Sequence, residues 1–112
     1  MSAVEVCKLI DVPSPGALAV VVAGVPVAVV RDSEGGLHAV RDICSHADVA
    51  LSEGEVDGCT LECWLHGSRF DLRSGKPTGP PATASIPVYQ VRVDGDGPDA
   101  VVLVDITVNA AR

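Results

Sequence analysis

The middle of this chain differs in character from its two ends, and this division constrains the fold more than any other feature. Strand-like runs rich in β-branched residues occupy residues 4–10, 18–23, 25–31 and 37–41, and they resume at 86–93 and 100–106. The segment 42–81 between them holds three of the four cysteines and two of the three histidines. Runs of Val and Ile favour strands. We therefore expect a β scaffold that is interrupted by an insertion built mainly from loops.

The composition supports an all-β class. Apolar residues make up 47% of the chain but aromatic residues only 3%, so the core is built from small aliphatic side chains. The 11 Gly and 8 Pro imply many turns, including a hairpin turn at residues 32–36. Within the insertion we expect one helical turn at residues 47–51 and short strands at 60–63 and 69–72.

Length and charge limit the function. A chain of 112 residues forms a single domain. Its net charge of −7 argues against binding to nucleic acids or anionic membranes and favours partners with basic patches. The carboxylates of Glu53, Glu55, Asp57 and Glu62 form either a docking surface for such a partner or a solvated face. No secretion signal or membrane-length apolar run is visible, so we expect a cytoplasmic protein.

Two short motifs carry the chemistry. Cys44 and His46 form C-x-H, and Cys63 and His66 form C-x-x-H, with sixteen residues between His46 and Cys63. Each motif supplies one thiolate and one imidazole, unlike a zinc finger in which two cysteines precede two histidines. The pattern suits a binuclear iron cluster with sulfur ligands on one iron and nitrogen ligands on the other. A mononuclear zinc site accepts the same four ligands and remains an alternative.

This motif pair resembles that of Rieske [2Fe–2S] proteins, and nearly the whole chain is similar to the small Rieske-type ferredoxins of bacterial ring-hydroxylating oxygenase systems. The resemblance implies an antiparallel base from residues 1–41 and 82–112, with a cluster-binding subdomain at 42–81. It also implies one [2Fe–2S] cluster, with Cys44 and Cys63 on the inner iron and His46 and His66 on the outer iron.

The resemblance also suggests roles around the ligands. Ser68 matches a serine that donates a hydrogen bond to a bridging sulfide, whereas Phe70 stands where respiratory Rieske proteins carry a tyrosine. Val49 and Leu65 occupy the positions of a disulfide in those proteins. Hydrogen bonds to sulfur raise the reduction potential. With one donor fewer, we expect a potential at the low end of the Rieske range, roughly −150 mV.

Several other residues near the motifs have alternative interpretations. Pro80, within the sequence Gly79-Pro80-Pro81, belongs to a stiff lid over the cluster or to an ordinary surface turn. Trp64 shields the cluster, contributes to a docking face, or simply packs in the core. Gly67 is expected where a Cβ atom would clash. Outside the motifs, we expect Cys7 and Cys59 to be small buried hydrophobic residues and His38 to be a surface or packed histidine, and we assign none of the three a further role.

The resemblance implies a one-electron carrier between a flavoprotein reductase and a terminal oxygenase, monomeric in isolation and not itself an enzyme. The exposed edge of His46 or His66 is the expected exit for the electron. A ferredoxin that serves iron–sulfur assembly or another housekeeping redox pathway is the alternative, and a structural zinc module is a more distant one.

Overall fold

The computed structural model describes residues 3–45, 49–65, 67–79, 82 and 84–110. These described residues form nine strands and three short 3-10 helices, which confirms the all-β class. The strands are β1 (Val4–Lys8), β2 (Gly16–Val22), β3 (Val25–Arg31), β4 (Leu37–Arg41), β5 (Val56–Asp57), β6 (Thr60–Glu62), β7 (Arg69–Asp71), β8 (Val88–Asp94) and β9 (Val101–Asn109). The 3-10 helices are η1 (Leu9–Asp11), η2 (Leu51–Glu53) and η3 (Gly97–Asp99).

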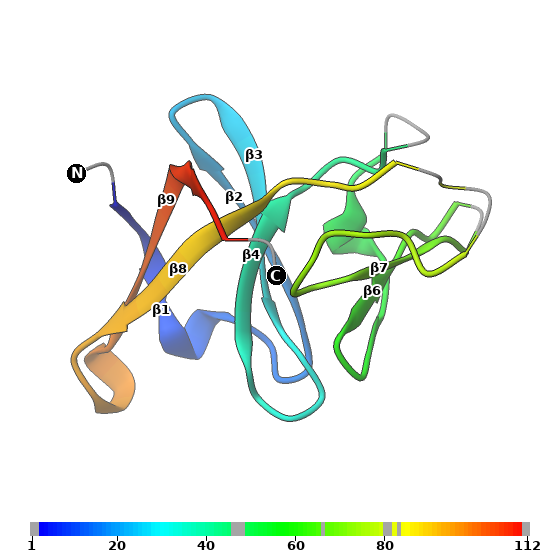
Figure 1. Ribbon diagram of the computed structural model, residues 1–112. Coiled ribbons are helices and arrows are strands. Elements are labelled where there is room, and N and C mark those ends of the chain that lie inside the picture. Colours follow the sequence, from blue (N-terminus) through cyan, green and yellow to red (C-terminus); the bar gives the residue numbers. More distant parts are fainter. Residues whose placement is uncertain (1–2, 46–48, 66, 80–81, 83, 111–112) are drawn as a thin grey trace.

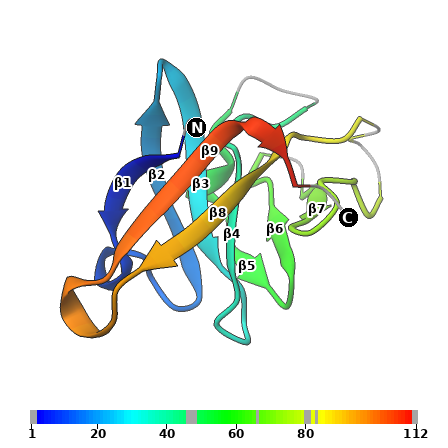
Figure 2. The same cartoon turned by 60° about the vertical axis from the view of Figure 1, so that its left-hand side comes forward.

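A six-stranded antiparallel sheet forms the larger part of the molecule. Its strand order is β1-β9-β8-β4-β3-β2. The edge strands β1 and β2 also contact each other, so the sheet curls toward an incomplete barrel (Figure 2). We call this sheet the base.

A second, three-stranded sheet in the order β5-β6-β7 lies between β4 and β8 in the sequence. Figure 1 shows its strands in green beside β4, at one end of the molecule. The loop before β5 contains the first cysteine–histidine motif, and the loop between β6 and β7 contains the second. The small sheet therefore positions the candidate site against the base.

Strand β3 forms the wall between two hydrophobic cores. Val27 and Val29 belong to the core inside the curled base, whereas Ala28 and Val30 belong to a second core. Successive side chains of a strand point to opposite faces, so a strand that is buried on both sides needs an unbroken apolar run. The four residues from Val27 to Val30 are fully buried. The second core, on the outer face of β3, contains both motif cysteines.

The sequence located β3 and β4 with their observed bounds, whereas the other expected strands differ from the observed ones by up to three residues at an end. The strand expected at residues 4–10 ends at Lys8, where η1 begins. Strand β5 was not expected at all. The turn expected at 47–51 appears instead as η2, and residues 47 and 48 lie outside the described part of the chain.

The position of η2 has a side-chain cause. The carboxylate of Asp42 accepts hydrogen bonds from both the backbone N–H and the hydroxyl of Ser52. Leu51 is fully buried, and the Gly54 N–H closes the turn on its carbonyl oxygen at 2.9 Å. The contact between Asp42 and Ser52 joins residues that are ten positions apart, so local sequence patterns do not reveal it.

No helix in the described ranges has both the length and the apolar character that a membrane crossing requires.

Candidate metal centre

The two motif loops begin with the same backbone hydrogen bond. The Cys44 N–H donates to the Val49 carbonyl oxygen at 3.0 Å, and the Cys63 N–H donates to the Ser68 carbonyl oxygen at 2.6 Å. Each bond therefore joins a cysteine to the residue five positions later. These closed segments include His46 in one loop and His66 in the other. Two segments of the same size, each starting at a cysteine, suit a site that takes equivalent ligands from two loops.

Both motif cysteines are withdrawn from solvent. Cys44 is 3% exposed and Cys63 is fully buried, and both belong to the core that contains Leu51, Leu61 and Phe70. All four cysteines of the chain lie in the described part, and none of them forms a disulfide. Two buried thiols in one apolar cluster are a sulfur donor pair for a metal centre that excludes water. The expected ligands His46 and His66 lie outside the described residues.

Two serine hydroxyls connect the loops to the segment that follows the prolines. The Ser45 hydroxyl donates to the Ala84 carbonyl oxygen at 2.6 Å, and the Ser68 hydroxyl accepts from the Ala82 N–H at 3.1 Å. Ser68 and Ala82 are both buried. The bond to Ala82 uses a lone pair of the Ser68 oxygen, so the hydroxyl proton can also donate. Pro80, the expected lid residue, lies outside the described residues, but residues 82 and 84 are anchored to both loops.

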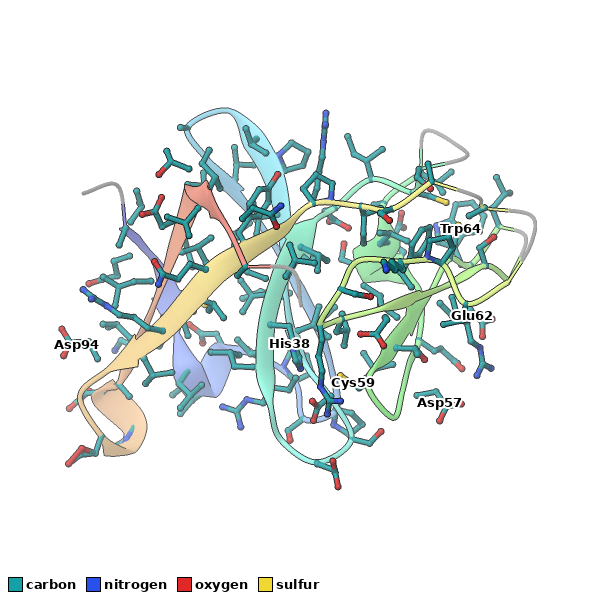
Figure 3. All side chains as sticks on the ribbon, viewed as in Figure 1. His38, Asp57, Cys59, Glu62, Trp64 and Asp94 are labelled. Carbon is teal, nitrogen blue, oxygen red and sulfur yellow. The ribbon has the colours of Figure 1, made fainter. Side chains whose placement is uncertain are left out.

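The apolar side chains around the second loop divide into a buried and an exposed group. Phe70 is fully buried and pairs with Leu61 across β6 and β7. Trp64 is 50% exposed and Leu65 is 40% exposed. Trp64 is therefore not a core residue, and it lies at the same end of the molecule as β6 and β7 (Figure 3). Exposed aromatic and aliphatic side chains side by side are typical of a contact surface.

The reason for a glycine at position 67 is its backbone angle and not a steric clash. Gly67 has φ of +75°, a conformation that L side chains rarely adopt. A Cβ atom built on this residue would meet no described heavy atom within 4 Å. The expectation of a clash is therefore wrong for the described surroundings.

Arg69 changes the charge of the acidic segment. Its guanidinium group is 2.9 Å from the Asp57 carboxylate and 3.2 Å from the Glu62 carboxylate. Glu53 and Glu55 are exposed. One arginine therefore partly neutralises two of the four carboxylates that the sequence brings together. The remaining surface is still acidic.

The cysteines and the histidine outside the motifs have different surroundings. Cys7 in β1 packs against the core of the base but is half-buried and not buried as expected, and this burial raises the pKa of its thiol. The thiol of Cys59 is also half-buried, but its sulfur lies 3.7 Å from Nε2 of His38. The same Nε2 lies 2.8 Å from the Asp32 carboxylate. Local sequence patterns do not connect these residues, because Cys59 follows His38 by 21 positions.

The donor set fits an iron–sulfur cluster better than it fits a zinc-finger site. Each loop supplies one buried sulfur donor. The buried Ser68, whose carbonyl oxygen accepts from the Cys63 N–H, has a hydroxyl that can donate to a cluster sulfur. A Rieske centre combines two thiolates on one iron with two imidazoles on the other, and the sequence supplies one histidine in each of the same loops.

Comparison with known proteins agrees with this donor set. Residues 2–90 match the Rieske [2Fe-2S] domain. The chain is 36% identical over 96 residues to the ferredoxin subunit of 3-phenylpropionate/cinnamic acid dioxygenase from Escherichia coli (strain K12), covering 85% of this chain and 89% of that protein. It is also similar to the solved ferredoxin of carbazole 1,9a-dioxygenase from Nocardioides aromaticivorans IC177, with a TM-score of 0.83, 34% identity and coverage of 94% and 98%.

A third similarity is to a chain in the complex of reduced oxygenase and oxidized ferredoxin of carbazole 1,9a-dioxygenase. Its TM-score is 0.77, with 30% identity and 93% of each chain covered. The chain described here belongs to the Rieske [2Fe–2S] family and carries one [2Fe–2S] cluster. Within that family it is of the ferredoxin type, an electron-transfer protein and not an enzyme in itself.

Proposed function

We propose that this protein carries one electron at a time to the terminal oxygenase of a ring-hydroxylating dioxygenase system, and that it receives each electron from a flavoprotein reductase. The similarity to a ferredoxin chain that has been solved in complex with its oxygenase is the observation that supports this proposal most directly. The proposal includes a monomeric carrier that acts in the cytoplasm.

The ligands follow from the two loops. In our proposal Cys44 and Cys63 hold the inner iron, and His46 and His66 hold the outer iron. Support comes from the burial of both thiols and from the matching hydrogen bonds that close the two loops. Residues 42–81 then act as the cluster-binding subdomain, carried by a base of residues 1–41 and 82–112.

When bound, the cluster supplies a centre that accepts and releases one electron. The residues of the chain prepare its surroundings. Phe70 and Leu51 keep water from the thiolate side, because both are fully buried. The Ser68 hydroxyl is placed to donate to a cluster sulfur, which stabilises the additional negative charge of the reduced state. The bonds to residues 82 and 84 hold the proline-containing segment against both loops.

The contact surface of the carrier is expected next to the outer iron. Trp64 and Leu65 lie between the ligands Cys63 and His66 in the sequence, and about half of each residue is exposed. An apolar contact beside the outer iron shortens the route of the electron to a partner. The excess of carboxylates on the chain steers this end toward a basic partner surface, which raises the association rate at low salt.

The first experiment tests the cofactor and its ligands. Protein purified without added metal should contain two irons and two acid-labile sulfides per chain, and its reduced form should give a Rieske EPR signal. The variants Cys63→Ser and His66→Ala should lose the cluster. Cys7→Ser and His38→Gln are the matched controls and should retain it. If a control variant loses the cluster and a ligand variant retains it, the assignment is wrong.

The second experiment tests the direction of electron flow. Chemically reduced protein is mixed with an oxidised terminal oxygenase of the ring-hydroxylating class, and reoxidation of the carrier is followed by stopped-flow absorbance. Rapid single-electron transfer that slows with increasing ionic strength is the expected result. Transfer no faster than that of a control carrier of equal potential and opposite net charge would contradict the proposal.

A further inference from the structure

A second group of metal-binding side chains lies away from the two motif loops. Asp32 follows β3, His38 lies in β4, and Cys59 lies in the turn between β5 and β6. One ligand atom from each residue lies within 4.8 Å of the other two. Figure 3 shows His38 and Cys59 next to each other, whereas Trp64 lies toward the other side of the small sheet.

Two contacts within this group meet at a single atom. Nε2 of His38 is 2.8 Å from Oδ2 of Asp32 and 3.7 Å from Sγ of Cys59. A ring nitrogen carries at most one hydrogen, so it either donates to the carboxylate or accepts from the thiol, but not both. A nucleophile with a base and an orienting carboxylate would use the two different nitrogens of the ring. The arrangement is therefore poor for a catalytic relay, and it points three donor atoms at one location.

The carboxylate of Asp32 is already held in place. Its Oδ1 accepts hydrogen bonds from the backbone N–H groups of Glu34 at 2.9 Å and Gly36 at 2.8 Å. This leaves Oδ2 directed toward His38. A Cβ atom at position 36 would lie only 2.5 Å from Oδ2, so a glycine is needed there. Hydrogen bonds of this kind fix the orientation of a metal-binding carboxylate.

The turn that carries Cys59 is fastened to the turn that carries Asp32. The Ser33 N–H donates to the Gly58 carbonyl oxygen at 3.0 Å, and the Gly58 N–H donates to the Ser33 hydroxyl at 2.9 Å. The Leu72 N–H also donates to the Cys59 carbonyl oxygen at 2.9 Å. The three donors are thus held together by backbone contacts between the base and the small sheet, independently of any contact between their side chains.

From this geometry we propose that Asp32, His38 and Cys59 form a second metal site, which binds a zinc ion through one oxygen, one nitrogen and one sulfur atom. Zinc accepts this mixed set at bond lengths of about 2.0–2.3 Å and commonly keeps a fourth position for water. Zinc binds a carboxylate and an imidazole in its neutral form, and the Cys59 thiol releases its proton to solvent when the zinc–sulfur bond forms.

The proposed zinc site is separate from the cluster. Cys59 and Cys63 lie at the two ends of β6, four residues apart. An extended strand rises about 3.3 Å per residue, so the two positions are roughly 13 Å apart. A single ion therefore does not bridge them. A zinc ion at Asp32, His38 and Cys59 would instead cross-link the base to the small sheet and stabilise the folded state by mass action.

The test uses the protein with its cluster in place. Zinc chloride is titrated into the protein by calorimetry. The protein is then passed through a desalting column, and zinc, iron and acid-labile sulfide are measured. We expect one zinc ion to be retained for each pair of irons, with no loss of iron or sulfide and with release of a proton. If no zinc is retained, or if iron falls as zinc rises, the proposal is wrong.

Variants identify the ligands. Cys59→Ser and Asp32→Asn should each weaken zinc binding by more than roughly 100-fold. Loss of a residue that only orients a ligand lowers metal affinity by up to about 100-fold, so loss of a ligand should cost more. The asparagine keeps a carbonyl oxygen for the N–H groups of Glu34 and Gly36, so the turn is retained. Cys7→Ser, which removes the other cysteine outside the motifs, should bind zinc as the unmodified protein does. Equal zinc affinity in Cys59→Ser and Cys7→Ser would overturn the assignment.

Discussion

The buried hydroxyl of Ser68 accepts a hydrogen bond of 3.1 Å from the backbone N–H of Ala82. The same oxygen carries a proton that can donate to a cluster sulfur, so one side chain connects the second motif loop, the proline-containing segment and the proposed cofactor. We therefore expect loss of the hydroxyl to change both the midpoint potential of the cluster and the thermal stability of the protein.

Replacing Ser68 with alanine should lower the midpoint potential by roughly 60–130 mV, because a charge-assisted hydrogen bond contributes about 1.5–3 kcal/mol and 59 mV corresponds to about 1.4 kcal/mol. The thermal stability should also fall, since the buried Ala82 N–H loses its acceptor. Redox titration and thermal unfolding measure the two effects. Ser45→Ala, which removes the bond to Ala84, should leave the potential nearly unchanged. An unchanged potential in Ser68→Ala would show that the hydroxyl does not reach the cluster.

Replacing Phe70 with tyrosine should raise the midpoint potential. Phe70 is fully buried in the core that contains both motif cysteines, so an added hydroxyl would lie beside the sulfur ligands. A new donor to sulfur stabilises the reduced cluster. The expected shift is of the order of 50 mV, by the same conversion of hydrogen-bond energy into potential. Leu72→Met, in the same core, adds no donor and is the control for altered packing. A midpoint equal to that of the control would count against this interpretation of Phe70.

Replacing Trp64 with alanine should slow electron transfer to the oxygenase and leave the midpoint potential unchanged. The side chain is half exposed, so its removal costs little folding energy, whereas loss of a central aromatic contact costs about 2 kcal/mol or more in binding. Stopped-flow rates measured against oxygenase concentration separate binding from transfer. Val21→Ala, which changes an exposed apolar residue on β2 of the base, should behave as the unmodified protein. An equal loss of rate in both variants would contradict a docking role for Trp64.

Acidification should remove the contribution of Asp32 to stability. The hydrogen bond from His38 and, to a smaller extent, the N–H groups of Gly36 and Glu34 lower the pKa of this carboxyl to about 2. The folded state then binds fewer protons than the unfolded state, so this stabilisation is present above about pH 5 and is lost as the pH falls toward 2. The difference in unfolding temperature between the unmodified protein and Asp32→Asn, both free of zinc, should therefore shrink between pH 5 and pH 3. A difference that stays constant over this range would contradict the prediction.

Removal of the iron should loosen the two motif loops before it affects the base. The cysteines belong to the core on the outer face of β3, whereas Val27, Val29, Val102 and Val104 form a separate core inside the base. Hydrogen exchange should show faster exchange at Cys44, Cys63 and Gly67 after iron is removed with a chelator under reducing conditions, while β3 and β9 remain protected. Equal loss of protection in β9 and in the loops would indicate a single cooperative unit instead.

The sequence by itself determined the parts of this protein that depend on local patterns. The unbroken apolar run of β3 and the turn residues before β4 predicted both strands with their observed bounds. The spacing of the cysteine–histidine motifs predicted the class of cofactor, because a metal cluster imposes ligand types that few other sites require. Two strand-like ends around a cysteine-rich middle predicted an insertion built mainly from loops, with short strands near β6 and β7, but not the three-stranded sheet that these strands form with β5.

The tertiary structure decided the features that join distant positions in the chain. The contact of Asp42 with Ser52, the anchoring of residues 82 and 84 by Ser68 and Ser45, and the convergence of Asp32, His38 and Cys59 span from six to 39 residues. Hydrophobic periodicity reports which face of a strand is buried, but it carries no information on which polar side chain meets which. These side-chain contacts depend on how β3, β4 and the small sheet pack together, and that packing is fixed only when the whole chain has folded.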